Sequence, residues 1–255
     1  MRRNCSLSQI FLKDEYYINK VISALNCSKK NVLEIGSGAG QISKIIAEKA
    51  NFLYCVEIDP KLAKVTKKEL INRQNTEIIQ ADIRDVSLSN FKKKLLIFSN
   101  VPYHLSRKLI EYLIFYRKNI TVNYLILQKE FAKKLSALPG SKMYGPMSCL
   151  IRYHAKIKHL FNIPAGAFRP SPKVSSSFVE LKFYKEAPII AKDKEFLFKL
   201  IKLSFKQRRK KISTIIKQKF PNKFINLSTR TDLDLNQRPE EIKLENFCKI
   251  SNYLS

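Results

Sequence analysis

Three glycines follow one short apolar run of this sequence. The run VLEI leads directly into GSGAG, so Gly36, Gly38 and Gly40 lie before the amphipathic stretch that begins at Gln41. A loop without Cβ atoms can turn sharply and lets a ligand approach its backbone closely. The G-x-G-x-G spacing therefore indicates a nucleotide-like ligand, and it differs from the G-x-G-x-x-G of nicotinamide and flavin enzymes. A glycine-rich turn without a ligand is the alternative.

Acidic residues lie at the ends of the next two apolar runs. Glu57 follows the glycine loop by about 20 residues, where a carboxylate can accept hydrogen bonds from a ribose diol. Asp82 ends the following run, where a carboxylate could accept a hydrogen bond from the exocyclic amine of an adenine. Glu34, just before the glycines, is typical of S-adenosylmethionine loops. Asp59 and Asp85 are typical of helix starts and polar connections.

The fourth apolar run ends in an amide, a proline and an aromatic ring. Leu95–Phe98 is short and unbroken, as in a central strand covered on both faces, and Asn100, Val101, Pro102 and Tyr103 follow it. Such strands end at the edge where open α/β sheets bind ligands. The tetrapeptide therefore favours a site for a flat polar ring. A plain strand cap is the alternative.

These candidate residues depend on a regular alternation of strands and helices. The runs NVLEIG, FLYCVEID, TEIIQAD, KLLIFSN and NYLILQ predict strands, with helices between them such as Gln41–Ala50 and Lys61–Asn72. This spacing predicts βαβ units and a parallel sheet. The segments KIKHLFNIP and SSSFVELKFYK have the composition of two further strands, and we expect them to form a hairpin that makes the sheet mixed at one edge.

The composition changes after the segment KEAP. Phe196–Lys219 has a strongly basic helix pattern, PEEIKLENFCKISNYL predicts another helix, and a stretch rich in Pro, Asn and Thr predicts a loop between them. We therefore expect a first domain over residues 1–187 and a helical second domain over residues 188–255.

The charge of the chain indicates a polyanionic partner. The 255 residues include 48 Lys and Arg against 21 Asp and Glu, a net charge of +27 that opposes compaction unless a polyanion is bound. Nucleic acid is the first candidate, and a Lys-rich compositional bias is the alternative. Within the run KQRRKK we expect Arg208, Arg209, Lys210 and Lys211 to contact phosphates. A solvated helix face is the alternative for that run.

The cysteines and the hydropathy exclude several other classes. The 5 cysteines form no C-x-x-C pair and have no histidine at metal-ligand spacing, so neither a disulfide framework nor a metal site is predicted. No apolar run approaches the roughly 18 residues of a membrane helix. We expect a protein of the reducing cytoplasm with no membrane partner.

The motifs together resemble the ribosomal RNA adenine N6-dimethyltransferases. N-V-P-Y after a G-x-G-x-G strand-turn-helix is similar to the N-[LIV]-P-Y of that family, and LSQIFLKD, GSKMYGPMS and PAGAFRPSPKVSSSFVEL resemble three further family segments. FKQRRKKI and RPEEIKLENFCKISN resemble the C-terminal domain of the bacterial small-subunit enzymes. The relatives that act on 23S rRNA share the first half and resemble this C-terminal region less.

The resemblance implies a fold, a cofactor and a substrate. The implied fold is α/β, with a Rossmann-like S-adenosylmethionine-dependent methyltransferase sheet and a small helical, basic C-terminal domain that binds rRNA. The implied reaction is dimethylation of N6 of two adjacent adenines in the hairpin loop near the 3′ end of 16S rRNA, within the small ribosomal subunit or its precursor, by a monomer. A 23S rRNA adenine dimethyltransferase of the macrolide-resistance type and a catalytically silent ribosome-assembly factor remain alternatives, and a nicotinamide oxidoreductase is disfavoured by the glycine spacing.

The resemblance also assigns roles to residues. An adenine N6 is a poor nucleophile that needs positioning rather than a strong base, so the Asn100 side-chain oxygen and the Val101 carbonyl would accept its two hydrogens. Tyr103, fixed behind Pro102, would stack on the extruded base, with Phe168 as a second aromatic wall. The implied cofactor contacts are Ile10, Leu12, Gly36, Gly38, Glu57, Asp82 and Asn100.

One position departs from the family pattern. Ile10 stands where the family usually has Asn or His, so a side-chain hydrogen bond to the cofactor is lost there. Backbone contacts from Ile10 and Leu12 can persist. We expect weaker cofactor affinity rather than loss of activity.

Overall fold

The computed structural model describes residues 10–229 and 232–255, which form two compact units. The first unit contains Met1–Ala132 and Lys158–Phe183, and the second contains Lys133–Ile157 and Tyr184–Ser255. The longer part of the second unit begins at Tyr184, close to the expected boundary at residues 187 and 188. The second unit also includes Lys133–Ile157, which the sequence placed in the first domain. No change of composition marks that segment, so a boundary drawn from composition could not detect it.

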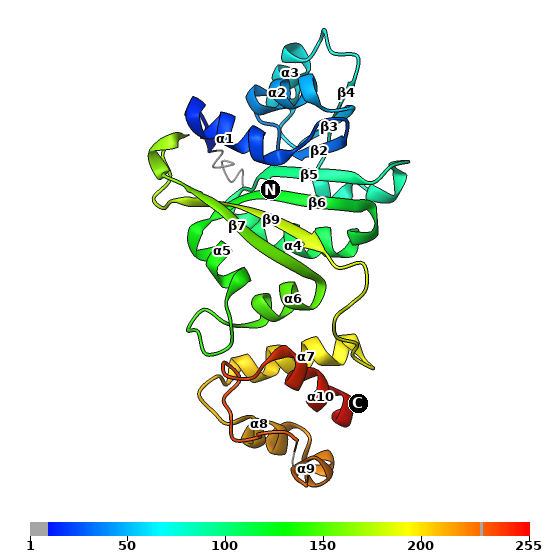
Figure 1. The fold of residues 1–255 in the computed structure, drawn as a ribbon, viewed down its shortest axis with the longest axis vertical. Helices are drawn as coiled ribbons and strands as arrows, with labels where there is room; N and C mark the ends of the chain where they lie inside the picture. The colour runs from blue at the N-terminus through cyan, green and yellow to red at the C-terminus, as the bar shows by residue number, and fades with distance from the viewer. Residues whose placement is uncertain (1–9, 230–231) are drawn as a thin grey trace, which may run out of the picture. The chain divides into compact units, whose positions relative to one another are not determined.

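A mostly parallel sheet forms the centre of the first unit (Figure 1). In the described residues its strand order is β4-β3-β2-β5-β6-β9-β7. The bounds are Asn31–Ile35 for β2, Phe52–Glu57 for β3, Thr76–Gln80 for β4, Leu95–Asn100 for β5, Ile120–Gln128 for β6, Ala155–Ile163 for β7 and Ser176–Phe183 for β9. Strands β2 to β6 pair in parallel, and β9 pairs antiparallel with β6. The predicted α/β fold with a sheet mixed at one edge is confirmed.

Helices cover both faces of this sheet. The bounds are Glu15–Leu25 for α1, Gln41–Lys49 for α2, Pro60–Glu69 for α3, Ser106–Phe115 for α4 and Lys129–Ser136 for α5. From β2 the chain moves outward through β3 and β4, whereas from β5 it moves in the opposite direction to β6. Because parallel crossovers are right-handed, α2 and α3 lie on one face and α4 lies on the other, as Figure 1 shows.

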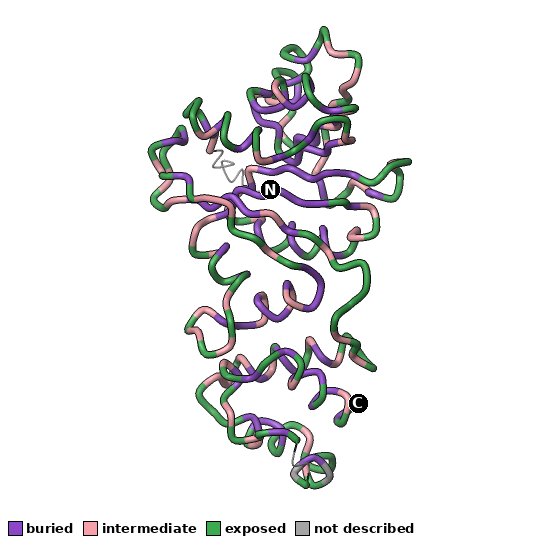
Figure 2. The backbone as a smooth tube through the Cα atoms, viewed as in Figure 1, coloured by how far each residue is buried: buried purple, intermediate pink, exposed green. Residues whose placement is uncertain are grey.

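Local sequence signals set where these elements begin and how deeply they are buried. Asp59 caps α3 by accepting hydrogen bonds from the backbone N–H groups of Lys61 and Leu62, as predicted for a helix start. In β5, Leu95–Ile97 are fully buried and Phe98 is 1% exposed. The central strands of the first unit are mostly purple, the colour of buried residues, in Figure 2. Strand β5 lies between β2 and β6 and is covered on both faces, so the prediction of a central strand from its unbroken apolar run is confirmed.

Short elements complete the first unit. Strand β1 (Phe11–Leu12) pairs antiparallel with β8 (Phe168–Arg169). The 3-10 helices are η1 (Ile83–Asp85), η2 (Leu88–Asn90), η3 (Tyr103–Leu105), η4 (Arg117–Asn119) and η5 (Ala165–Ala167). No helix in the described part of the chain is long and apolar enough to cross a membrane. Each of the four cysteines described there is free and buried, and Cys5 lies outside the described residues.

The second unit is helical and has its own core. Its helices are α6 (Pro146–His154), α7 (Lys194–Lys206), α8 (Ile212–Lys219), α9 (Pro221–Ser228) and α10 (Leu244–Leu254). The predicted continuous helix over residues 196–219 is wrong, because a turn over residues 207–211 separates α7 from α8. The buried positions keep helical spacing across the turn, so hydrophobic periodicity alone could not reveal it.

Arg208 lies in the turn between α7 and α8 and makes polar contacts that help to hold it. Its guanidinium pairs with the Glu240 carboxylate and donates two hydrogen bonds of 3.2 Å to the backbone carbonyl of Lys142. Arg208 therefore joins three segments of the second unit, whereas Arg209 and Lys210 are exposed in the turn. The turn after α7 is thus held by polar contacts, whereas Phe205 in the last turn of α7 packs against Tyr144 and Phe247.

We predict that Arg208→Ala destabilises the second unit by about 1 kcal/mol, because it removes a partly exposed ion pair and leaves the Lys142 carbonyl without its donor. Arg209→Ala is the matched control, since it removes the same charge from an exposed position. Urea denaturation and amide exchange in residues 184–255 measure the difference. Equal stability of the two variants would contradict a structural role for Arg208.

Candidate functional site

The register of the sheet brings three predicted site residues to one level. Continued past the last paired residues, the β2–β3 and β2–β5 pairings place Gly36 beside both Glu57 and Asn100. The Ser99 hydroxyl donates a 2.7 Å hydrogen bond to the Ile35 carbonyl and so ties the ends of β2 and β5 together. Strands β2 and β5 are also where the direction of strand order reverses, which is where open α/β sheets bind ligands.

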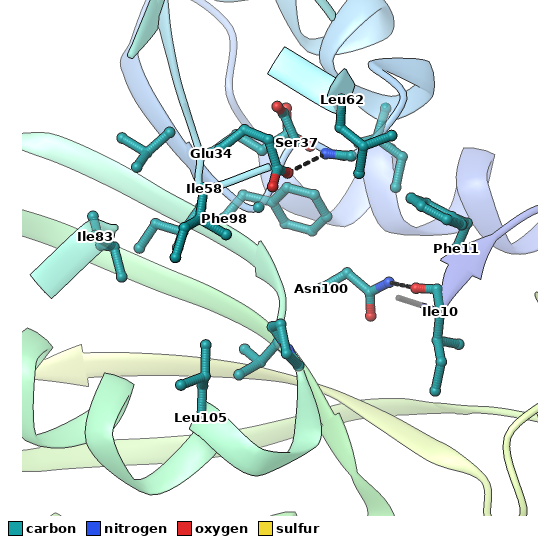
Figure 3. Close-up of a pocket in the computed structure, with 18 of the residues that line it drawn as sticks. Ile10, Phe11, Glu34, Ser37, Ile58, Leu62, Ile83, Phe98, Asn100 and Leu105 are labelled. Atoms are coloured by element: carbon teal, nitrogen blue, oxygen red, sulfur yellow. Dashed lines mark hydrogen bonds between the residues drawn. The ribbon is translucent and has the colours of Figure 1, made fainter. Parts of the chain in front are cut away.

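A cavity of about 440 Å³ opens at this edge of the first unit (Figure 3). Its walls come from the ends of β2, β3 and β5, from β1, and from the segments that follow β4 and β5. All but one of the predicted catalytic and cofactor residues line it: Ile10, Leu12, Gly36, Gly38, Glu57, Asp82, Asn100, Val101, Pro102 and Tyr103. The exception is Phe168.

The glycine loop needs its glycines for conformation and for space. Gly36 and Gly38 have φ values of +76° and +59°, in the left-handed region. A Cβ on Gly38 would lie 2.6 Å from the Phe11 ring of β1. The loop is therefore closely packed on one side. Phe11 lines the cavity beside it and was not singled out in the sequence, because its role follows only from the fold.

Two buried side chains hold the glycine loop in place. Glu57, 4% exposed, accepts hydrogen bonds from the backbone N–H of Gly38 at 2.9 Å and of Asp59 at 3.0 Å, one on each carboxylate oxygen. Thr66 in α3 donates to the Gly38 carbonyl at 2.8 Å and lies 3.3 Å from the Ser37 hydroxyl. A carboxylate oxygen can accept two hydrogen bonds, so Glu57 keeps acceptor capacity for a ribose, which stays a prediction.

Asp82 is held by an arginine that the sequence analysis missed. The Arg84 guanidinium bonds both carboxylate oxygens, with Nε at 3.0 Å from each and Nη2 at 2.5 Å from Oδ2. These hydrogen bonds hold the pKa of Asp82 below its usual range. The carboxylate is therefore an ionised acceptor at the cavity wall. Its predicted bond to an adenine amine is untested.

Asn100 is oriented by the main chain of Ile10. The Asn100 amide Nδ2 donates a 2.8 Å hydrogen bond to the Ile10 carbonyl (Figure 3). Only the NH₂ group can donate to a carbonyl, so the orientation of the amide is determined by this contact. The Asn100 Oδ1 atom is left as an acceptor at the cavity. Because Ile10 contributes its backbone, the departure from the family's Asn or His does not remove this contact.

The two predicted aromatic walls differ in position. Tyr103 lines the cavity, is partly exposed, and places its hydroxyl 3.1 Å from the Ser176 hydroxyl of β9. Phe168 is 1% exposed and packs in the apolar core of the first unit, opposite Leu12 in the β1–β8 pair. Its role as a wall of an adenine pocket stays a prediction, and it would require the ring to turn out of the core.

The four cations of the KQRRKK run lie in the second unit and differ from one another. Arg208 pairs with Glu240, and Lys211 donates a 3.2 Å hydrogen bond to the Asn236 side chain. Arg209, Lys210 and Lys211 are exposed, whereas Arg208 is partly buried. The run lies in the turn between α7 and α8, so the alternative of a helix face does not describe it. Contact of these residues with RNA stays a prediction.

Glu34 is a further buried acid at the cavity. It is 3% exposed, the Cys55 thiol lies 3.9 Å from one of its carboxylate oxygens, and burial raises its pKa from 4.5 to about 8. The nearby Glu57 raises the Glu34 pKa further, whereas a hydrogen bond with Ser43 opposes the rise. The folded protein therefore favours the protonated, neutral form of Glu34.

We predict that the Glu34→Gln variant gains stability relative to the wild type as pH rises from about 5 to 9. Between its unfolded value of 4.5 and its folded value of about 8, Glu34 binds its proton more tightly in the folded state. The wild type therefore loses stability across this window, and a permanently neutral Gln does not. Thermal melting of both proteins at matched pH values measures the difference. Parallel curves would show that Glu34 does not titrate in this window.

Comparisons with solved structures agree with this architecture. A dimethyladenosine transferase from Plasmodium falciparum superposes with a TM-score of 0.79 at 23% identity, covering 94% of this chain and 95% of that one. The 23S rRNA methyltransferase ErmE superposes with a TM-score of 0.75 at 20% identity, covering 96% of this chain and 99% of the other. At these identities the likeness shows the fold.

Comparisons of sequence go further. Proteins named "Ribosomal RNA small subunit methyltransferase A" match 97% of this chain: one from Legionella pneumophila (strain Corby) is 32% identical over 250 residues and 96% covered, and one from Aeromonas hydrophila is 34% identical over 254 residues and 92% covered. The family model described as "Ribosomal RNA adenine dimethylase" matches residues 1–255. With its Asn-Val-Pro-Tyr strand end, its glycine loop and a match that spans the whole chain, this protein belongs to the ribosomal RNA adenine dimethylase family.

Proposed function

We propose that this protein transfers methyl groups from S-adenosyl-L-methionine to N6 of two adjacent adenines in the hairpin loop near the 3′ end of 16S rRNA. The observation that carries the proposal is the orientation of Asn100, whose Nδ2 is engaged by Ile10 and whose Oδ1 is left as an acceptor at the cavity. The similarity to relatives named for the small subunit extends over the second unit, which supports 16S rRNA rather than 23S rRNA as the substrate.

The residues of the cavity fit S-adenosylmethionine. Gly36 and Gly38, with left-handed φ values, line the cavity with backbone that carries no side chain. Glu57 retains acceptor capacity at the end of β3, and Asp82 is an ionised acceptor after β4. Ile58, Leu62 and Ile83 supply apolar surface to the same cavity. The cofactor, when bound, supplies a methyl group activated by its sulfonium.

The chain's own groups would position the base rather than deprotonate it first. The Asn100 Oδ1 atom and the Val101 carbonyl accept the two N6 hydrogens and direct the nitrogen lone pair toward the methyl group. Positive charge develops on N6 as its new bond to carbon forms, and these two acceptor dipoles stabilise it. The proton leaves N6 afterwards. Tyr103 stacks on the extruded adenine and keeps its plane in line.

RNA affinity would come mainly from the second unit. Arg209, Lys210 and Lys211 are exposed in the turn between α7 and α8 and can contact phosphates without reading sequence. The net charge of +27 favours the same kind of partner. Methyl transfer would thus take place in the first unit, and most phosphate contacts would be made by the second.

Mass spectrometry of rRNA nucleosides tests the proposal. Small subunits that lack the modification are incubated with the protein and S-adenosylmethionine, and N6,N6-dimethyladenosine is measured in the 16S rRNA. Naked 23S rRNA is treated in parallel. Dimethyladenosine in 16S rRNA alone supports the proposal, its appearance in 23S rRNA alone supports the macrolide-resistance type, and its absence from both, with the protein bound to subunits, supports a silent assembly factor.

We predict that Asn100→Ala lowers the methylation rate by about 10²-fold, because a preorganised contact to the developing charge is lost. S-adenosylmethionine affinity, measured by calorimetry, should fall no more than severalfold, since the variant loses only the anchor of the Ile10 backbone. Single-turnover rates on small subunits measure the first effect. Near wild-type turnover would remove Asn100 from the mechanism.

We predict that replacing Arg209, Lys210 and Lys211 together with Ala weakens binding to small subunits and lowers the log-log salt slope by about two to three units, roughly one for each phosphate contact. Arg208 is kept because it stabilises the second unit. The matched control replaces Lys92, Lys93 and Lys94, three exposed lysines at the amino end of β5, the end opposite Asn100. Equal slopes for the two triple variants would assign the effect to net charge alone.

A further inference from the structure

We infer that Ser176 is a positioning residue for Tyr103: its hydroxyl holds the tyrosine ring at the place where it stacks on the substrate base. The inference rests on the proposed function and adds a residue to that site. The two hydroxyl oxygens lie 3.1 Å apart, and 73 residues separate them in the sequence. Ser176 itself does not line the cavity, so it acts through the tyrosine.

Ser176 is a rigid point of attachment. It is fully buried and is the first residue of β9, where it pairs with Gln128 of β6 in antiparallel register. The preceding residue, Ser175, accepts a 3.0 Å hydrogen bond at its carbonyl from the backbone N–H of Lys129. The Ser176 backbone is thus held against β6, so its side chain extends from a fixed point of the sheet.

Tyr103 needs such an attachment because its ring is only partly packed. Its backbone is held by the turn in which the Leu105 N–H donates to the Pro102 carbonyl at 2.9 Å, but the side chain faces an open cavity. Rotation about the Cα–Cβ bond would swing the ring away from the base. A hydrogen bond at the phenol oxygen, the far end of the side chain, fixes the position of that oxygen and so restrains this swing.

The chemistry of the ring supports this role. A phenylalanine would stack on an adenine as well as a tyrosine does, so stacking alone gives the phenol hydroxyl no function. The proton transfer of the proposed reaction gives it none either, because N6 loses its proton after it has been methylated. The bond to Ser176 accounts for the hydroxyl as an orienting group.

Ser177 offers a matched control in the same strand. It is 1% exposed and its hydroxyl lies 2.9 Å from Oδ1 of Asn162. Successive side chains of a strand point to opposite faces, so Ser177→Ala removes an equally buried hydroxyl that does not reach Tyr103. Any general cost of losing a serine from β9 appears in this control.

A double-mutant cycle on small subunits tests the coupling. We expect Ser176→Ala and Tyr103→Phe each to lower kcat by about fivefold, the effect of one neutral hydrogen bond, while KM for the subunit stays within twofold because phosphate contacts set it. The double variant should be no slower than either single variant. Ser176→Thr, which keeps a hydroxyl, should have the kcat of the wild type rather than that of Ser176→Ala. Ser177→Ala should leave kcat unchanged.

Two kinetic outcomes would overturn the inference. One is a further fivefold loss when Ser176→Ala is added to Tyr103→Phe, since the serine would then act by another route. The other is an equal loss in Ser177→Ala, which would make the effect a general one of strand β9.

A readout without catalysis separates this inference from the proposed function. In protein labelled with ¹³C-tyrosine, the Tyr103 ring signal is identified by its disappearance in Tyr103→Phe. Ser176→Ala should shift that signal and increase ring motion, and Ser177→Ala should do neither. An unchanged Tyr103 signal in Ser176→Ala overturns the inference whatever the activity. Absence of dimethyladenosine in treated rRNA overturns the proposed function, while the ring signal still decides whether Ser176 holds Tyr103.

Discussion

The site depends on one buried carboxylate that accepts hydrogen bonds from two backbone N–H groups. Glu57 accepts the N–H of Gly38 on one oxygen and the N–H of Asp59 on the other. The first bond fixes the glycine loop after β2, and the second fixes the segment in which Asp59 caps α3. Helix α3 then returns Thr66 to the carbonyl of Gly38. Both polar groups of Gly38 are therefore held by side chains, the N–H by Glu57 of β3 and the carbonyl by Thr66 of α3.

The site residues that the sequence could predict are those that lie at the ends of strands. Gly36, Glu57, Asp82 and Asn100 each follow an apolar run, and parallel strands bring their carboxyl ends to one edge, so the sequence order of runs was enough to group them. The mixed edge formed by β9 was predicted from a different signal, the β-rich composition of two segments that follow the last parallel strand.

The parts that sequence could not predict arise from contacts between distant elements. Thr66 lies in an ordinary amphipathic helix that no motif marks. Ser176 lies in a segment that resembles the family, but nothing in that segment indicates a contact with Tyr103. Phe168 differs in another way: the resemblance implied an aromatic wall of the adenine pocket, pairing of β8 with β1 places the ring in the core, and the implied role stays a prediction. Arg208 was grouped with its neighbours by charge, although its ion pair with Glu240 gives it a different environment.

Ile10 shows how a motif position can change without changing the geometry that it supports. The family's Asn or His at this position differs from Ile in its side chain, but the contact to Asn100 is made by the carbonyl group, which every residue has. What the contact requires is that β1 pass close to the end of β5, and that path is set by the pairing of β1 with β8 and by the Phe11 ring against Gly38. The orientation of the Asn100 acceptor therefore does not depend on the side chain at position 10, and weaker affinity for a ligand beside Ile10 stays a prediction.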